Sequence, residues 1–427
     1  MPSRQDQLHS YQYSLQRVVA ALVTHDPDPQ RSPLRRAGTT ALVSLLIASL
    51  AVGAAAIYGL FTGHSNVDPT DVDVVFQEKG TGARYVYLDA DDRLHPVLNY
   101  TSGLLLAAAQ TPQLKSISAE KLAKVPLGAP LGIPDAPDSL PRTDALLTER
   151  WSVCTDNQGS RSTLLVGAKL TDGTIAQQAE RALLVRDPAQ RTYLVFGNRK
   201  FAIPEDRQVA TRRVLGYADQ QPWPVSVAWI NAVPPGPDLV APRIPESAGR
   251  FENFRVGQLV TDSRQTAVIL PDGTADLTAM QARLLQALPG ADAPVDIGNE
   301  FATLPESKTR LSDAGDPNGL PSAVPTLAAG TPTRACVTLP VDPKNGDGIR
   351  IDPTIPAGIP VSGRTPAPGV VLADLVHVAR GKGAVTVVAA SPSTPASSGT
   401  VSIVTDTGRQ YPLASRELLA KLGYGKV

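Results

Sequence analysis

The sequence predicts an α+β protein with a short cytoplasmic amphipathic helix, one transmembrane helix, and an extracytoplasmic region that has a central domain and four small strand-turn-strand-helix repeats. Three observations lead to this prediction. Residues 39–61 carry no charged side chain, a strand-turn-strand-helix pattern recurs four times after them, and both cysteines follow the uncharged stretch. One apolar span with cysteines on one side of it is typical of a membrane-anchored protein whose main body lies outside the cytoplasm.

Residues 1–38 are predicted to form a cytoplasmic amphipathic segment. Apolar side chains recur there at the spacing of one helix face: Leu8, Tyr11, Leu15, Val18, Val19 and Leu22. The Asp-Pro-Asp-Pro sequence at 26–29 is expected to end the helix, and Pro33 is expected to keep the next connection irregular. A helix this short has no core of its own, so we predict that this face, together with Arg17, binds another protein. The membrane surface is the competing acceptor, for which Arg17 alone supplies positive charge in the helix body.

Residues 39–61 are predicted to form the transmembrane helix. At about 1.5 Å per residue the stretch is roughly 34 Å long, which exceeds the hydrocarbon core of about 30 Å. Three arginines precede it and favour a cytoplasmic amino terminus: Arg31, Arg35 and Arg36. A cleaved signal peptide is the alternative, but its basic leader would be far shorter than 38 residues. Ala51, Ala55 and Gly59 lie four residues apart, a spacing that permits close approach of a partner helix.

The charge balance argues against a nucleic-acid partner. Lysine plus arginine and aspartate plus glutamate each total 40, so the formal charge is zero. Residues 1–38 hold five arginines and three aspartates, a net +2, which leaves −2 for the remainder. Neither part has a long basic or acidic tract. The 39 prolines predict many loops and extended connections.

The two cysteines, Cys154 and Cys336, both lie on the predicted external side. In an oxidising compartment such a pair indicates one disulfide. A bridge across 182 residues would contribute roughly 5 kcal/mol in the chain-entropy model. Two unrelated buried thiols are the alternative.

The repeated pattern begins with an apolar strand and ends with an apolar pair on a helix. The strands are predicted at 85–88, 193–196, 267–270 and 401–404, and the pairs are Leu104-Leu105, Val214-Leu215, Leu284-Leu285 and Leu418-Leu419. The pairs start 19, 21, 17 and 17 residues after their strands. Any hairpin followed by an amphipathic helix would look similar, and the copies have no fixed period, so a solenoid is not indicated.

These patterns predict ten segments. They are a cytoplasmic segment at 1–38, a transmembrane helix at 39–61, a linker at 62–82, repeat 1 at 83–112, the first part of the central domain at 113–190, repeat 2 at 191–220, a connecting segment at 221–264, repeat 3 at 265–290, the second part of the central domain at 291–395, and repeat 4 at 396–427.

No catalytic or cofactor motif is evident. A phosphate-binding loop needs a serine or threonine after glycine-lysine, but Gly383 follows Lys382 and Val427 follows Lys426. There is no G-x-S-x-G motif. The stretch 342–352 resembles a calcium loop, but two ligand positions hold Pro343 and Thr354. We therefore expect no cofactor, no metal and no enzyme activity.

The whole chain resembles EccB, the single-pass membrane component of actinobacterial type VII (ESX) secretion systems. The most specific part is 7–36, with Y-x-x-x-L-x-R at Tyr11, Leu15 and Arg17, Ala-Leu-Val at 21–23, and Asp28-Pro29 followed by Pro-Leu-Arg at 33–35. The ending at 420–425, Ala-Lys-Leu-Gly-Tyr-Gly, is also similar. The resemblance implies an elongated extracytoplasmic region, in which a β-rich central domain held by a disulfide is flanked by the four repeats. It also implies a structural role beside the EccC ATPase and the EccD and EccE membrane proteins.

The first functional hypothesis is therefore a structural subunit of inner-membrane secretion machinery, with the cytoplasmic helix docked on membrane-complex partners and the external region free to form a homodimer. The second is an external module that binds the cell wall (peptidoglycan), since repeated small folds supply several weak sites. An ATPase is the third, although the nucleotide motif that it requires is missing.

Overall fold

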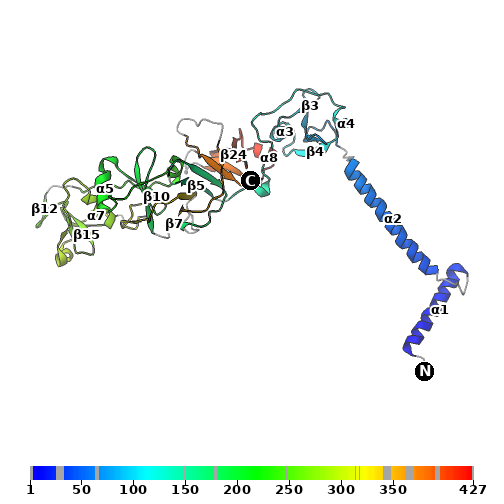
Figure 1. The fold of residues 1–427 in the computed structure, drawn as a ribbon, viewed down its shortest axis with the longest axis horizontal. Helices are drawn as coiled ribbons and strands as arrows, with labels where there is room; N and C mark the ends of the chain where they lie inside the picture. Colours follow the sequence, from blue (N-terminus) through cyan, green and yellow to red (C-terminus); the bar gives the residue numbers. More distant parts are fainter. Residues whose placement is uncertain are drawn as a thin grey trace. The chain divides into compact units, whose positions relative to one another are not determined.

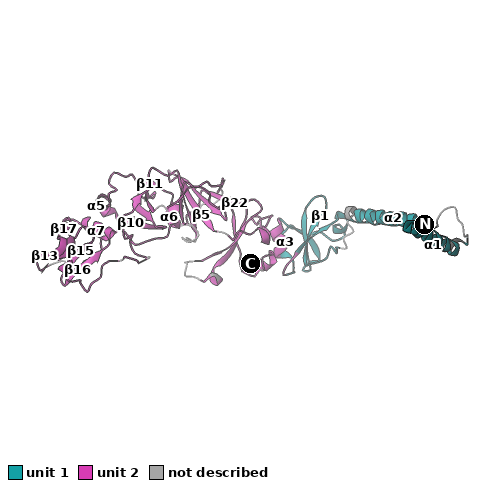
Figure 2. Cartoon of the chain, turned by 90° about the horizontal axis from the view of Figure 1, so that it is seen from below, with its two compact units in different colours: residues 1–98, 106–109, 113–132 teal, residues 99–105, 110–112, 133–427 magenta. Residues whose placement is uncertain are grey.

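The computed structural model describes residues 3–25, 33–62, 67–148, 150–156, 158–176, 180–245, 249–312, 314–316, 318–339, 348–361, 370–389 and 395–425. The chain divides into two compact units (Figure 2). Unit 1 consists of residues 1–98, 106–109 and 113–132, and unit 2 of residues 99–105, 110–112 and 133–427.

Unit 1 contains two long helices and one mixed sheet (Figure 1). The helices are α1 (Arg4–Thr24) and α2 (Pro33–Thr62). The strands are β1 (Val74–Glu78), β2 (Arg84–Leu88), β3 (Arg93–Pro96) and β4 (Gln113–Ile117), in the order β3-β2-β1-β4, and the short helix α4 (Ala119–Leu122) follows β4. Strand β2 is antiparallel to both neighbours, whereas β4 runs parallel to β1.

The core of unit 1 lies against this sheet. Val74, Val75 and Phe76 in β1 are all buried, and Val74 and Phe76 point to the same face of the sheet because they are two residues apart. They pack with residues from every other strand of the sheet and from α4: Tyr87, Leu94, Ile117 and Leu122.

Unit 2 is built around a seven-stranded sheet of order β21-β22-β6-β5-β19-β20-β7. Its strands are β5 (Trp151–Asp156), β6 (Ser162–Val166), β7 (Thr174–Ile175), β19 (Arg334–Leu339), β20 (Ile349–Ile351), β21 (Ile359–Pro360) and β22 (Leu375–Val378). They come from two stretches of chain, 151–175 and 334–378. The sheet therefore forms only after the segment between these stretches has returned.

Four further sheets belong to unit 2. One has the order β10-β9-β8-β11, with β18 also paired to β8; the others are β12-β13, β16-β15-β14-β17 and β23-β24-β25. Their strands are β8 (Arg181–Arg186), β9 (Thr192–Phe196), β10 (Arg199–Ile203), β11 (Trp223–Pro224), β12 (Arg250–Phe251), β13 (Phe254–Arg255), β14 (Leu259–Thr261), β15 (Thr266–Leu270), β16 (Gly273–Leu277), β17 (Val295–Asp296), β18 (Thr326–Leu327), β23 (Ala384–Val388), β24 (Thr400–Val404) and β25 (Gln410–Pro412).

The remaining helices are short. They are α3 (Tyr100–Leu106), α5 (Gln208–Val214), α6 (Val227–Ala232), α7 (Ala279–Gln286) and α8 (Leu418–Lys421), with 3₁₀ turns at Thr143–Ala145, Glu205–Arg207, Gly298–Thr303 and Ala396–Ser398. Helix α7 begins with a capping box in which Thr278 and Gln281 bond each other's backbone amides. Helix α6 packs on β5 and β19, where Trp229 is fully buried.

Three of the sheets share one topology, which we call the four-strand unit. Three strands form an antiparallel meander, a helix follows, and a fourth strand then runs parallel to the first. The four-strand units are β1–β4, β8–β11 and β14–β17, with parallel pairs β1·β4, β8·β11 and β14·β17. In each four-strand unit a later segment also makes a parallel bridge to the third strand. Leu127 bridges to β3, Pro235 to β10 and Glu306 to β16.

The predicted α+β class is confirmed, and each predicted apolar strand is present, in β2, β9, β15 and β24. Each predicted apolar pair lies in or directly beside α3, α5, α7 or α8. The predicted domain boundaries stay a prediction. The expectation for Pro33 was wrong, because Pro33 is the first residue of α2. A proline fits there since its fixed φ suits a helix and its missing N–H has no partner in the first turn.

Candidate functional site

Helix α1 has well-defined ends. The Ser3 hydroxyl accepts a hydrogen bond from the Asp6 amide at 3.3 Å, and the Asp6 carboxylate accepts from the Ser3 amide at 3.0 Å, which completes a capping box. The Ser3 hydroxyl also donates to the Asp6 carboxylate at 2.7 Å, and this bond, followed by the one from the Ser3 amide, lowers the pKa of Asp6 below its usual range. His25 adopts a left-handed conformation at φ 60° and donates its N–H to the Ala21 carbonyl. The Asp-Pro-Asp-Pro sequence predicted to end the helix lies outside the described residues.

The predicted docking face of α1 is largely exposed. Five of its six apolar side chains are between 49% and 75% exposed: Leu8, Tyr11, Leu15, Val18 and Leu22. The sixth, Val19, is half-buried. The five exposed side chains follow one another at alternating spacings of three and four residues, so they form one continuous stripe on the helix. Such a contiguous apolar surface marks a site of contact with protein or membrane.

Arg17, which was predicted to bind together with this face, does not lie on the stripe, because it is two residues after Leu15 and one before Val18. Its guanidinium carbon is 5.7 Å from the centre of the Tyr13 ring, four residues earlier on the helix. A cation over an aromatic face is attracted by the ring electrons. The Tyr13 ring therefore lies under the guanidinium while leaving Arg17 at the surface.

Helix α2 contains a segment that is long and apolar enough to cross a membrane, residues 38–59, with a mean hydropathy of 2.3 and no buried residue. Its hydroxyl groups bond to carbonyls of the same helix, for example Ser44 to Thr40 at 2.8 Å and Ser49 to Leu46 at 2.9 Å. A hydroxyl paired within its own helix leaves no donor unsatisfied in lipid.

The predicted packing residues of α2 lie on its open surface. Ala51, Ala55 and Gly59 are all exposed, and a Cβ added at Gly59 would meet no atom within 4 Å. Of the predicted topology determinants, Arg31 lies outside the described residues. Arg35 and Arg36 belong to the first turn of α2, and their side chains are outside the described part.

Cys154 and Cys336 form a disulfide with an S–S distance of 2.01 Å. They stand opposite each other in the antiparallel pair β5·β19, and both are at most 1% exposed. Two residues along, Ser152 and Thr338 hydrogen-bond across the same strands at 2.9 Å. The disulfide links the two ends of the segment that contains the four-strand units β8–β11 and β14–β17.

The titratable groups that cluster in unit 2 bond to one another. Asp187, 3% exposed, accepts from the Arg191 guanidinium at 2.8 Å, and the Tyr193 hydroxyl lies 3.4 Å from the same carboxylate. Burial lowers the pKa of Lys200, whose ammonium donates to the Ile230 carbonyl at 2.5 Å. Sequence patterns did not reveal this cluster, because its members come from a strand end, a turn and a second strand. Their mutual bonds indicate a structural role.

The glycine-lysine turn at 381–382 binds its own chain. The Gly381 amide, which a phosphate would need, donates to the Asp406 carboxylate at 2.8 Å. The second glycine-lysine site includes Lys426, which lies outside the described residues. Residues 342–347 of the calcium-like stretch are also outside them, and Asp352 accepts from the amides of Thr333 and Arg334. Within the part of the chain that is described, no group of three acidic, histidine or cysteine residues could hold a metal ion.

His95 is buried, and sequence patterns did not predict its contacts. It is 6% exposed, its Nδ1 lies 2.8 Å from the Ala129 carbonyl, and its Nε2 lies 3.1 Å from both carboxylate oxygens of Asp91. Burial lowers the pKa of His95, but the bonds to Ala129 and Asp91 outweigh it and leave the pKa raised. The ring packs on Gly128, where a Cβ would lie 2.4 Å from it.

Comparisons with known proteins agree on one family. The family model described as "Type VII secretion system ESX-1, transport TM domain B" matches residues 1–427. A Mycolicibacterium smegmatis protein named "ESX-3 secretion system ATPase EccB3" is 28% identical over 98% of this chain and 84% of its own length. A Mycobacterium tuberculosis protein named "ESX-1 secretion system ATPase EccB1" is 27% identical over 74% of this chain and 67% of its own length.

Two solved structures share the fold. A chain of the intact ESX-5 inner membrane complex superposes with a TM-score of 0.63 at 22% identity, covering 100% of this chain and 90% of that chain. A chain of the EccB3 dimer from the ESX-3 core complex gives a TM-score of 0.61 at 23% identity, covering 83% of this chain and 93% of that chain.

Proposed function

The chain belongs to the EccB family of type VII secretion systems, and on that premise we propose that it is a non-catalytic structural subunit of an inner-membrane ESX secretion complex. In this proposal α1 binds a cytoplasmic partner, α2 holds the protein in the membrane, and the sheets form its extracytoplasmic body. The observation that carries the proposal is the uncovered apolar stripe of α1 in the same chain as an uncharged spanning helix.

The energetics of α1 support a docking role. Fully burying an aliphatic or aromatic side chain contributes about 1.5–3 kcal/mol, so five such side chains represent a large unused driving force. The capping box and the left-handed cap fix both ends of the helix, which lowers the entropic cost of binding. A partner with an apolar groove would therefore receive α1 as a preformed helix.

The charge distribution supports the orientation. Arg31, Arg35 and Arg36 precede the span, and basic residues beside a span stay in the cytoplasm. The sheets then lie in the oxidising compartment, where a disulfide between Cys154 and Cys336 is stable. The arginines beside the span and the disulfide therefore support the same compartment for the sheets by two independent arguments.

We also propose which partners it meets. The EccC-, EccD- and EccE-like membrane subunits are the proposed neighbours of α1 and α2, with the small-residue face of Ala51, Ala55 and Gly59 against a neighbouring membrane helix. A homodimer through the extracytoplasmic body is proposed as well, since a relative of the same fold is known as a dimer.

The docking role is tested by a double substitution on the stripe, Tyr11→Asp with Leu15→Asp. Two buried carboxylates would oppose binding, so co-purification of the membrane subunits after mild detergent extraction should fall at least about tenfold. The matched control is Gln12→Asp with Gln16→Asp, which adds the same charge to exposed positions one residue along. Equal co-purification of both variants with the wild type would contradict the proposal.

Some relatives are named as ATPases, and we propose that this chain has no such activity. The proposal rests on the missing hydroxyl residue after each glycine-lysine pair and on the Gly381 amide, which is occupied by Asp406. ATP turnover by the purified full chain that is lost on Lys382→Ala, with the fold preserved, would overturn it.

A cell-wall binding role is the second candidate. The repetition of one four-strand unit favours it, because several copies of a weak site bind a repetitive polymer tightly. Detergent-solubilised full chain should then sediment with isolated peptidoglycan and be released by soluble fragments of it. If the chain stays in the supernatant, the cell-wall binding role is contradicted and only the structural role remains.

A further inference from the structure

Among the residues that the structure describes, strand β23 is an edge strand with few partners on its outer side. It pairs with β24 on one side, and on the other the described residues place a single parallel bridge, between Leu146 and Gly383. Gly383 donates to the Ala145 carbonyl, and the Leu147 amide donates to the Gly383 carbonyl at 2.7 Å. The chain that contains Leu146 then leaves β23 and enters β5.

Further along β23, other backbone N–H and C=O groups also point to the outer side. Because Gly383 directs its N–H and C=O outward, the alternation of a strand directs those of Val385 and Val387 outward too. No described residue pairs with them there. Val387 and Val388 are also 38% and 53% exposed.

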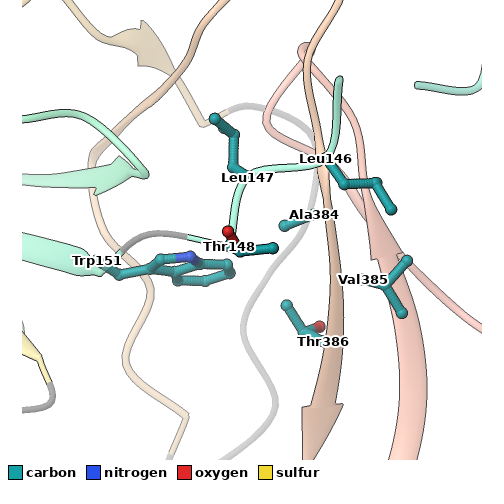
Figure 3. Close-up of a pocket in the computed structure, with 7 residues that line it drawn as sticks. All are labelled: Leu146, Leu147, Thr148, Trp151, Ala384, Val385 and Thr386. Atoms are coloured by element: carbon teal, nitrogen blue, oxygen red, sulfur yellow. The ribbon is translucent and has the colours of Figure 1, made fainter. Parts of the chain in front are cut away.

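A cavity lies where the chain separates from β23 (Figure 3). It has a volume of about 220 Å³, and all seven residues that line it are uncharged: Leu146, Leu147, Thr148, Trp151, Ala384, Val385 and Thr386. The Trp151 ring extends from β5 toward this space beside Thr148 (Figure 3). An apolar cavity of 150 Å³ can hold benzene, so this one has room for an aromatic or branched side chain.

The three four-strand units show which kind of strand pairs with the first strand of a meander. In all three four-strand units the first strand has a parallel strand on the side away from the meander. Strand β23 occupies the corresponding first position of the β23-β24-β25 meander, with α8 after it. Residues 422–425, the described residues after α8, form no strand.

The edge also lacks the features that block pairing. Natural edge strands discourage association with proline or charged side chains. The outer strands β3, β10, β21 and β25 carry such residues, namely Arg93, Lys200, Pro360 and Pro412. The sequence of β23, Ala-Val-Thr-Val-Val, has neither.

We propose that the outer edge of β23 and the adjoining cavity form a docking site for an uncharged extended segment of another protein, which adds as a strand parallel to β23 and places one apolar side chain in the cavity. Main-chain bonds to Val385 and Val387 supply the pairing, as in other cases of strand addition. The uncharged lining selects against a charged side chain at the cavity position. This site is separate from the docking face of α1.

The test titrates the full chain in detergent with the peptide acetyl-Ser-Thr-Val-Phe-Val-Thr-Ser-amide and with its counterpart that has Asp in place of Phe. Binding is followed by tryptophan fluorescence, since Trp151 lines the cavity, and by hydrogen exchange of the Val385 and Val387 amides. The Phe peptide should bind, should slow exchange at both amides, and should bind at least about tenfold more tightly than the Asp peptide.

The matched variants are Val387→Pro and Val371→Pro. The first removes an outward N–H and leaves the bonds from β23 to β24 in place, whereas Val371 is exposed and forms no strand. Only Val387→Pro should weaken binding, again about tenfold or more. Equal affinity of both variants would mean that the cavity binds the side chain without strand pairing, which overturns the proposal. Absence of binding, or amides already protected in a concentration-dependent way by a second copy of the chain, would overturn it too.

Discussion

The helices α1 and α2 and the sheets use apolar residues in opposite ways. Leu8, Tyr11 and Leu15 on α1 stand open to solvent, and so does the apolar surface of α2, whereas Phe76 in β1 and Trp229 in α6 are fully buried. The sheets cover their own apolar faces and can be stable alone. The helices leave theirs uncovered, and in the proposed function a bilayer covers α2 and a partner covers α1.

The largest expected effect concerns the bridge that holds the central sheet. Replacing Cys154 and Cys336 together by alanine should cost roughly 5 kcal/mol of unfolding free energy, because a long closed loop no longer restricts the unfolded chain. Denaturant unfolding of the full chain in detergent measures this. The helical signal of α1 and α2 should stay constant. An unchanged midpoint would show that the sheet does not depend on its bridge.

Two truncations sharpen the comparison directly. Phe76→Ala should destabilise the protein by about 3–5 kcal/mol, because it opens a cavity in the core of unit 1. Leu15→Ala on α1 should change the stability of the isolated chain by less than about 0.5 kcal/mol, since Leu15 has no cover to lose. Urea unfolding compares the two. A large loss for Leu15→Ala would mean that the stripe packs within the chain itself.

The hydrogen bonds of His95 to Ala129 and Asp91 create a pH dependence in unit 1. Because the folded pKa of His95 is raised above its unfolded value of about 6.5, its contribution is complete below that pH and is lost as pH rises through the folded pKa. The wild type should therefore lose more stability between pH 5.5 and 8 than His95→Asn does. Equal losses of stability in the two proteins would show that His95 does not cause the pH dependence.

The smallest expected effect is at the start of α1. Ser3→Ala removes the hydroxyl that accepts from the Asp6 amide and should cost about 1 kcal/mol of local helix stability. Hydrogen exchange at the first turn should quicken about fivefold, whereas exchange in β1 should stay the same. Ser14→Ala is the control, because the Ser14 hydroxyl bonds only the Ser10 carbonyl within the helix.

Residue patterns predicted the elements that have strong local signals. The uncharged span, the stripe of α1 and the strands with the longest apolar runs were visible in this way. The fourth strands β11 and β17 were not, because each is two residues long and has no alternation to read. Their places depend on pairing with distant strands. The His95 contact with Asp91 and Gly128 likewise arises only when a later segment packs against β3.

The most direct test of the account is the sidedness of α1 and the sheets. Single cysteines at Gln12 in α1 and at the exposed Arg310 in unit 2 would be probed with a membrane-impermeant maleimide on spheroplasts, since the native cysteines are bonded to each other. The account predicts that the Arg310→Cys protein labels on intact spheroplasts, and that the Gln12→Cys protein labels only after permeabilisation. Labelling of Gln12→Cys on intact spheroplasts, with Arg310→Cys protected until permeabilisation, would contradict it.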